Sequence, residues 1–337
     1  YEMQRSLVGS EMCIRDRGAY ISLHFHGKGW KVIAVGRRKS DNGFFAGYGI
    51  PYYSVDIIMK DEFGKLPKDH IDVVAHFAGD LPASMEGYDG IRYIDSILKG
   101  TYNVLQFMHE NGIPKIIFPQ SLFDISYLFG SKTPIPADSV RKAPLEGDHA
   151  MYVVCKNAAV DVIEHFYKVW GIKRFILRLS RVYAYHPNPY TYREGNKVMV
   201  SDRLLMKWAE EGKPIAIWGE PDRLLETCAM PDFLQIVEKC ADSGLDGGLY
   251  NIGSGGSTLD ERVHGIVDVF SPSCRKSAIS YAPEKQSARQ FVLDISKTKS
   301  ELGYMPRYSW KDYCEWFKEE RKQQRFAKLW GKEEDYK

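Results

Sequence analysis

The sequence lacks several features that mark large classes of proteins. No stretch approaches the roughly 18 consecutive apolar residues of a membrane-spanning helix, and the N-terminal region has no apolar core of a signal peptide. The 46 basic and 44 acidic residues leave a formal net charge of only +2, so no overall field draws the chain to a polyanion. We therefore expect a protein that binds neither nucleic acid nor membranes.

Cysteine is also sparse. The six cysteines lie far apart, with no Cys-x-x-Cys pair and no spacing with histidine that is typical of zinc: Cys13, Cys155, Cys228, Cys240, Cys274 and Cys314. In a chain of 337 residues this pattern predicts reduced thiols, a cytoplasmic location and no metal site.

What the sequence does contain is a regular alternation of strand and helix patterns. Short β-branched apolar runs, typical of buried strands, alternate with longer amphipathic stretches that end at glycine. The predicted strands are 32–35, 72–77, 115–118, 174–179 and 248–253, and the predicted helices are 21–29, 91–111 and 152–170. Repeated strand–helix–strand units of this spacing predict an α/β fold with a doubly wound parallel sheet.

One pattern indicates a specific chemistry. Tyr152 and Lys156 are four residues apart at the start of a predicted helix, so both side chains lie on one face. A tyrosine, with an ordinary pKa of about 10, is a poor base at neutral pH, but a nearby ammonium favours its phenolate. The phenolate can accept the proton of a hydroxyl while hydride leaves the same carbon. Ser121, at the end of a predicted strand, can hold the alcohol in place.

These three residues resemble the Ser-Tyr-Lys triad of the extended short-chain dehydrogenases, the NAD-dependent epimerase/dehydratase family. Further segments match the family's pattern in the same order: 76–79, 100–103, 177–183, 251–255, 294–297 and 301–304. The likeness covers about Gly18 to Tyr308. It implies a Rossmann-like fold, an NAD(P) cofactor and a catalytic role for Ser121, Tyr152 and Lys156.

The resemblance also implies which residues bind the cofactor. Besides Tyr152 and Lys156 they are Gly18, Arg37, Arg38, Asp56, Ile57, Phe77, Ala78 and Gly79. Arginines after the second strand suit the 2′-phosphate of NADP, so NADP is favoured over NAD, although a solvent-facing basic turn would have the same sequence. We interpret His76 as a residue packed under the cofactor rather than as an acid or base.

The first residues depart from the family. Met3–Arg17 resembles sequencing-adapter DNA translated onto the front of a gene, and we interpret residues 1–17 as non-native. With Gly18 as the third glycine of the family's phosphate turn, the first two fall at Met12 and Arg15. We therefore expect residues 1–17 to fail to form the first strand and the phosphate turn, and to weaken NAD(P) binding.

The remaining sequence divides into regions by its composition. Residues 18–180 are predicted to form the NAD(P)-binding Rossmann domain, whose sheet is completed by about 245–260. Residues 181–320 are predicted to be mostly a substrate-binding α/β region. The highly charged residues 321–337 are predicted to form a helical tail with a solvated face.

The reaction is narrowed by residues that the family's subgroups require. Leu122 and Phe123 follow the serine where dehydratases of the family carry acidic groups, so a dehydratase is disfavoured. The two arginines with which nucleotide-sugar epimerases grip the diphosphate would fall at Leu225 and near Glu284. A bound diphosphate would then need Arg223, Lys285 or Arg289 instead, and this departure puts the nucleotide-sugar substrate in doubt. The expected substrate-binding residues are Ser121, Arg181, Tyr190 and Arg223.

We therefore expect an NAD(P)-dependent epimerase or oxidoreductase that acts on the hydroxyl of a sugar, including a nucleotide sugar. Two alternatives stay open: an NADPH-dependent reductase of a small ketone or aldehyde, and a non-catalytic member of the fold that binds a partner or RNA. The resemblance further implies a homodimer through helices 91–111 and 152–170. Val160, Ile163 and Tyr167 recur there at helical spacing, although one side of the helix must also cover the sheet.

Overall fold

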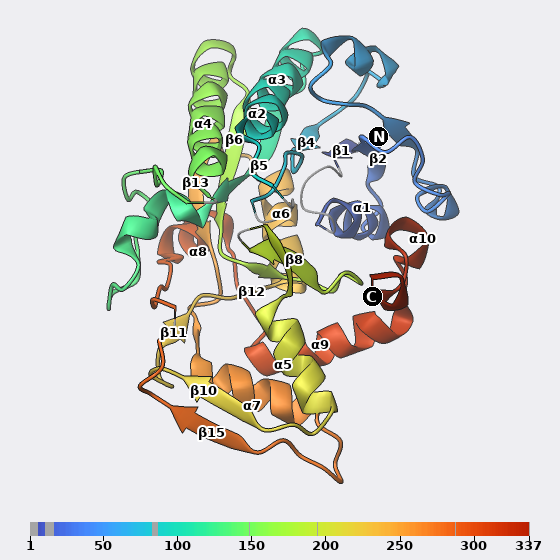
Figure 1. Ribbon diagram of the computed structural model, residues 1–337. Helices are drawn as coiled ribbons and strands as arrows, with labels where there is room; N and C mark the ends of the chain where they lie inside the picture. Colours follow the sequence, from blue (N-terminus) through green and yellow to red (C-terminus); the bar gives the residue numbers. More distant parts are fainter. Residues whose placement is uncertain are drawn as a thin grey trace.

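A seven-stranded parallel sheet forms the centre of the larger half of the molecule (Figure 1). The computed structural model describes residues 6–10, 17–82, 87–147, 149–193, 195–286 and 288–336. The strand order is β13-β6-β5-β4-β1-β2-β3: successive strands are added on one side of β1 and then on the other, as is typical of doubly wound sheets. The strands are β1 (Ser6–Ser10), β2 (Lys31–Gly36), β3 (Tyr52–Ser54), β4 (Val73–Ala75), β5 (Lys115–Ser121), β6 (Lys173–Leu179) and β13 (Gly247–Ile252). The predicted Rossmann-like fold is confirmed.

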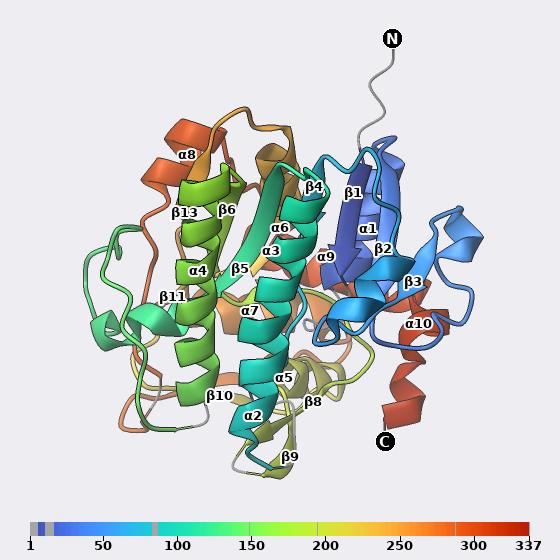
Figure 2. The same cartoon turned by 90° about the horizontal axis from the view of Figure 1, so that it is seen from above.

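Helices cover both faces of this sheet (Figure 2). On one face lie α1 (Arg17–Gly27) and α6 (Met230–Asp242), and on the other lie α3 (Gly100–Glu110) and α4 (Ala150–Trp170). Strands buried on both faces need apolar side chains at every position, which explains the unbroken apolar runs in β2 and β5.

The predicted helix 91–111 is one helical rod with a change of winding. It consists of α2 (Gly90–Tyr93), the π-helical η3 (Ile94–Lys99) and α3. At the junction, a side-chain carbon on Gly100 would lie 2.6 Å from the Cδ1 of Ile57. Glycine at this position therefore lets the helix approach the loop after β3 closely.

A smaller region below the sheet is built from α5 (Ser201–Glu210), α7 (Leu259–Phe270) and α9 (Trp310–Gln323) (Figure 1). Its core joins aromatic side chains of α9 to those after β6, and Tyr183 packs edge-on against Trp310 at 4.8 Å. Four two-stranded sheets complete it: parallel β7–β12 and β10–β15, and antiparallel β8–β9 and β11–β14. Their bounds are β7 (Val182–Tyr183), β8 (Tyr190–Arg193), β9 (Asn196–Met199), β10 (Ile215–Trp218), β11 (Leu224–Leu225), β12 (Cys228–Ala229), β14 (Ser257–Thr258) and β15 (Ile279–Ala282).

Short helical elements connect these layers. They are η1 (Ala46–Tyr48), η2 (Lys60–Lys65), η4 (Leu122–Leu128), α8 (Ser296–Leu302), α10 (Ala327–Trp330) and η5 (Glu333–Tyr336). Across the described ranges, no helix combines the length and the apolar character that a membrane crossing needs.

The structure corrects the expectation for the first residues. Ser6–Ser10 forms β1, which pairs in parallel with β2 on one side and with β4 on the other. The expectation that residues 1–17 would not supply the first strand was therefore wrong. Main-chain groups make the ladder bonds, so a short stretch without proline can fill the central position. The expected glycine positions, Met12 and Arg15, lie outside the described residues.

The end of the chain also differs from its prediction as a solvated tail. Phe326, Leu329 and Trp330 are buried, and the Phe326 ring lies 4.5 Å from that of Tyr20 in α1. Figure 1 shows α10 beside α1. These apolar residues at spacings of three and one form one small face among many charges, and that face docks on the Rossmann domain.

Candidate active site

The site begins where the central strands end. Ser121 is the last residue of β5, and its hydroxyl accepts a hydrogen bond from the N–H of Phe123 at 3.2 Å. This bond caps the helical turn η4, which fixes the direction of the serine side chain. Ser121 is buried but for a small fraction of its surface. In an open α/β sheet, ligands bind at the carboxyl ends of the strands, which is where Ser121 lies.

The first turns of α4 bring the other two members of the predicted triad to the same place. The Lys156 ammonium donates to the carbonyl of Pro119 in β5 at 2.9 Å and lies 4.3 Å from the centre of the Phe118 ring. It lies 6.0 Å from the centre of the Tyr152 ring. The structure therefore brings Ser121, Tyr152 and Lys156 together. The hydrogen bond of Lys156 to Pro119 also joins α4 to β5.

His76 directly follows β4, near enough to Lys156 to interact with its charge. Its Nε2 is hydrogen-bonded to the Thr101 hydroxyl at 3.0 Å, and its side chain is fully buried. Burial and the charge of Lys156 lower the pKa of His76 to about 3. The imidazole is therefore neutral at physiological pH, which agrees with its interpretation as a packed residue.

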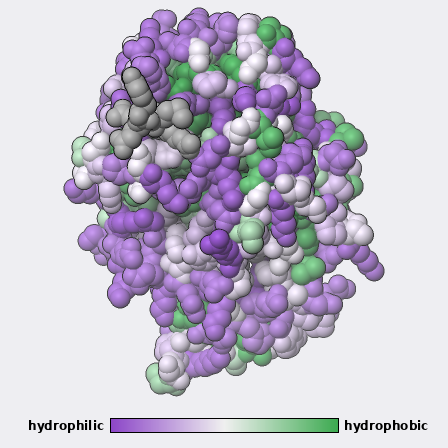
Figure 3. Space-filling model, turned by 180° about the vertical axis from the view of Figure 1, so that it is seen from behind, coloured by the Kyte–Doolittle hydropathy of each residue, from purple (hydrophilic) through white to green (hydrophobic). Residues whose placement is uncertain are grey.

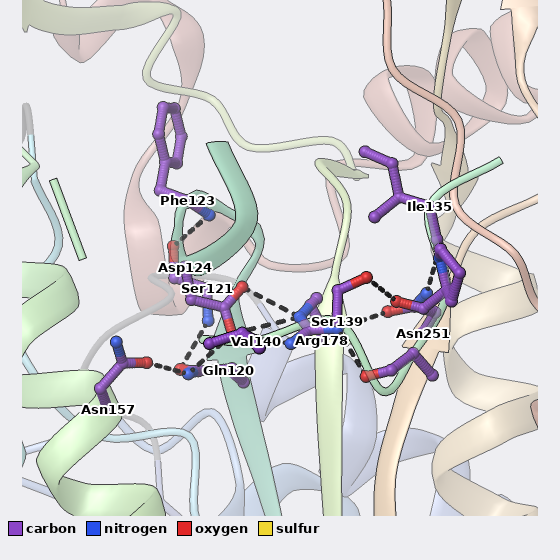
Figure 4. Close-up of polar contacts among 12 residues, drawn as sticks. Gln120, Ser121, Phe123, Asp124, Ile135, Ser139, Val140, Asn157, Arg178 and Asn251 are labelled. Carbon is purple, nitrogen blue, oxygen red and sulfur yellow. Dashed lines mark hydrogen bonds and ion pairs between the residues drawn. The ribbon is translucent and has the colours of Figure 1, made fainter. Parts of the chain in front are cut away.

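A buried polar network supports the serine from behind (Figure 4). The Gln120 amide accepts a bond from the Ser121 N–H at 2.9 Å and donates to Asn157 in α4 at 2.7 Å. It also donates to the Asp124 carboxylate at 3.2 Å. Gln120 thus connects the end of β5 to the residue that follows Lys156.

Arg178 of β6 completes this network. Its guanidinium and the Asp124 carboxylate are both fully buried and are joined at 2.9 Å and 3.0 Å. It also donates to Asn251 in β13 and to the carbonyl of Ala137. Burial raises the pKa of Asp124, and Arg178 opposes that rise. Sequence reasoning missed these roles, although an arginine inside an otherwise apolar strand signals a buried partner.

The predicted cofactor residues lie along the same edge of the sheet. Arg37 and Arg38 follow β2, Asp56 and Ile57 follow β3, and Phe77, Ala78 and Gly79 follow β4. Gly18 is buried in the first turn of α1. A side-chain carbon on Gly79, whose φ is +134°, would lie 3.0 Å from Ile97, so only glycine fits there without strain. The residues of this edge fit a dinucleotide: exposed cations after β2, a glycine main chain after β4, and the triad at β5.

The predicted substrate residues other than Ser121 are more scattered. Arg181, whose side chain is about half exposed, makes an ion pair at 3.1 Å with Asp202, which is largely buried. The Tyr190 ring in β8 lies under the Lys197 ammonium at 4.5 Å. Arg223 precedes β11, and in the described part of the chain its buried Nε has no hydrogen-bond partner.

A buried carboxylate that the sequence did not reveal, that of Glu226, directly follows β11. One oxygen of Glu226 accepts four main-chain N–H bonds, including those of Ser254, Gly255 and Gly256, and the other accepts that of Leu293. Burial raises the pKa of Glu226, whereas these N–H groups lower it. Glu226 therefore holds the glycine-rich loop after β13 against the smaller region.

The doubly wound sheet, with a serine, a tyrosine and a lysine at the carboxyl ends of its strands, defines a Rossmann-fold enzyme. Residues 17–253 match the sequence model of the NAD dependent epimerase/dehydratase family, and the chain belongs to that family.

Individual relatives are distant in sequence. The chain is 23% identical over 292 residues to a UDP-glucuronate 4-epimerase of Thermodesulfobacterium geofontis. This match covers 84% of the present chain and 80% of the relative. It resembles the structure of a UDP-glucose 4-epimerase from Thermotoga maritima with UDP-glucose, with a TM-score of 0.71, 18% identity and coverage of 93% and 99%. It also resembles the structure of a UDP-glucuronic acid 4-epimerase from Bacillus cereus in complex with UDP-glucuronic acid and NAD. The TM-score is 0.67 and the identity 17%, and the match covers 94% of this chain and 99% of that chain. These two structural likenesses show the fold.

Proposed function

We propose that the protein is an NAD(P)-dependent epimerase or oxidoreductase that acts on the hydroxyl of a sugar, with a nucleotide sugar as the first substrate to test. The juxtaposition of Ser121, Tyr152 and Lys156 at the end of β5 carries this proposal. The UDP-sugar epimerases among the similar proteins support the choice of substrate class.

In this mechanism each residue of the triad has one task. The Ser121 hydroxyl orients the reacting alcohol, and the Tyr152 phenolate accepts its proton. Lys156 keeps the tyrosine in its ionised form through its positive charge. Bound NAD(P) would supply the acceptor for the hydride that leaves the same carbon. When hydride comes back to the opposite face of the carbonyl, Tyr152 would return its proton to the oxygen, so that the epimeric alcohol forms with no net redox change.

A second function is a carbonyl reductase that consumes NADPH. It is favoured by Leu225 and Glu284, which stand where a diphosphate would need arginines. Against it, the buried Nε of Arg223 has no hydrogen-bond partner among the described residues, so it can donate to an oxygen of a bound diphosphate.

The test is to incubate the protein with UDP-glucose or UDP-glucuronic acid and NAD or NADP, and to follow both the sugar product and the cofactor absorbance. We predict that Tyr152→Phe lowers turnover at least about 100-fold and leaves cofactor affinity within a few-fold, because the hydroxyl takes the proton whereas the ring only packs. The half-exposed Tyr127 provides the control, Tyr127→Phe.

Epimer formation without net change in the cofactor supports the epimerase, and net NADPH consumption with a simple carbonyl substrate supports the reductase. Turnover by Tyr152→Phe equal to that of the unsubstituted protein would contradict both.

A further inference from the structure

Arg38 lies where proteins of this fold bind the adenosine end of a dinucleotide. It is the second residue after β2, and an acidic residue at this strand end would bind the free ribose hydroxyls of NAD. The nearest acid along the chain, Asp41, turns away from that role, because its two oxygens accept the N–H groups of Gly43 and Phe45 at 3.1 Å and 2.7 Å. The charged side chain available to a ligand at the end of β2 is therefore the arginine and not a carboxylate.

Arg38 is held at both its main chain and its side chain. The Tyr52 hydroxyl donates to its carbonyl at 2.8 Å, and its own Nη1 donates to the carbonyl of Leu329 at 2.6 Å. The neighbouring Asn42 amide donates to the carbonyl of Lys328 at 3.0 Å. A guanidinium carries five N–H donors, so the bond to Leu329 orients it and leaves donors for a ligand.

The Leu329 carbonyl that accepts this bond belongs to residues 324–336 near the end of the chain, which we call the C-terminal strap. Its anchor is the stack of Phe326 on Trp330, with ring centres 4.3 Å apart, packed against Tyr20 of α1. On its other side the strap reaches the smaller region, where Trp330 lies 4.9 Å from His186 and Glu333 pairs with Arg203. The carbonyl of Leu329 is therefore fixed from two sides.

We infer that the C-terminal strap determines cofactor preference: by holding Arg38 through the Leu329 carbonyl, it builds a site for a phosphomonoester on the adenosine ribose and so selects NADP over NAD. The inference rests on the proposed use of a nicotinamide cofactor. A long arginine side chain that is ordered before binding loses less freedom when the phosphate arrives. The planar guanidinium also suits two phosphate oxygens at once.

The experiment compares two shortened chains by calorimetric binding of NADP, NAD, adenosine 2′,5′-bisphosphate and inorganic phosphate. Residues 1–331 keep Leu329 and its anchor, whereas residues 1–325 lose both. For 1–325 we expect the Kd of NADP and of the bisphosphate to rise about tenfold and that of NAD to change less than about twofold. For 1–331 we expect all these constants to stay within about twofold.

Arg38→Ala supplies the second test, because it does not depend on the strap's removal. In the full chain it should weaken NADP binding at least about tenfold, and in 1–325 it should add less than about threefold, since the two changes remove one site. Inorganic phosphate that binds as tightly as the bisphosphate would overturn the assignment to the adenosine ribose. Equal affinity of the full chain for NAD and NADP, or additive effects of the two changes, would overturn the inference and leave the proposed function intact.

Hydrogen exchange separates failure of this inference from failure of the proposed function. If the full chain binds neither NAD nor NADP, the proposed function is wrong and the cofactor assignment falls with it. Hydrogen exchange then tests by itself whether the strap restrains the loop that contains Arg38. If it does, the amides of residues 37–42 exchange faster in 1–325 than in 1–331. Equal exchange in the two chains would show that the strap does not hold this loop.

Discussion

At the scale of single residues, the burial of His76 makes the free energy of unfolding depend on pH. Its pKa of about 3 in the folded chain is lower than the ordinary 6.5, because it is fully buried beside Lys156. Between these values the unfolded chain binds a proton that the folded chain does not. The contribution of His76 to stability is therefore complete above about pH 6.5 and is lost as the pH falls towards 3, by at most about 1.4 kcal/mol per pH unit.

We predict that His76→Asn flattens this dependence. The asparagine amide can still bond to Thr101 but has no proton to gain, so the free energy of unfolding should fall less steeply from pH 6.5 to pH 4 than in the unsubstituted chain. Urea unfolding at a series of pH values measures the slope. The exposed His70 gives the control, His70→Asn, and an unchanged slope in His76→Asn would show that other groups govern the acid response.

The three residues proposed to act together could be picked out from the sequence because their pattern is local. Tyr152 and Lys156 are four residues apart in a helix, and Ser121 ends an apolar strand, so finding them needed no knowledge of distant contacts. The role expected of Arg181 came instead from a resemblance, and that of Tyr190 from its place in an aromatic loop. Their contacts with Asp202 and Lys197 depend on how a loop region folds, which no periodicity encodes.

At the scale of elements, the ion pair of Asp124 and Arg178 joins η4, β6 and β13 behind the serine (Figure 4). We predict that Asp124→Ala lowers the free energy of unfolding by about 3–5 kcal/mol, because it leaves a buried guanidinium without its counter-charge. Asp161→Ala, which removes the exposed partner of Arg141, should cost less than about 1 kcal/mol. Urea unfolding measures both.

The double variant Asp124→Leu, Arg178→Met separates pairing from packing. With both charges replaced by apolar groups, at least half of the lost stability should return. A double variant no more stable than Asp124→Ala would mean that the network's hydrogen bonds, rather than the unpaired charge, account for the loss.

The predicted elements agree with the structure where their pattern is periodic, and they miss what long-range contacts decide. The helix 152–170 and the strand 115–118 are seen as α4 and within β5. The pairing of β1 and the docking of the C-terminal strap depend on partners far away in sequence: Tyr20 in α1, for example, packs against Phe326 of the strap. Amphipathic spacing tells which side of an element is buried but not against which element.

At the scale of the whole molecule, apolar side chains are distributed unevenly over the surface. The face seen from behind is mainly hydrophilic, with apolar residues in small separate groups (Figure 3). By contrast, α2, α3 and α4 lie side by side and carry a series of exposed large apolar residues: Ile91, Tyr102, Val154, Val169 and Trp170. Val160 and Ile163 are not among them, because they face the sheet and are fully buried. Exposed apolar residues on neighbouring helices are the kind of feature that marks an interaction surface.

We predict that this surface joins two copies of the chain across α3 and α4, so that the protein sediments as a dimer at micromolar concentration. Val154, which is 37% exposed near the start of α4, is the position to change. Val154→Glu should yield monomers, because two carboxylates would face each other across a symmetric apolar contact and lose their hydration. Met305→Glu places the same charge on an exposed apolar residue away from these helices and should leave the dimer intact. Sedimentation velocity distinguishes the outcomes: a monomeric unsubstituted chain, or a Val154→Glu variant that still dimerises, would assign this apolar surface to something other than self-association.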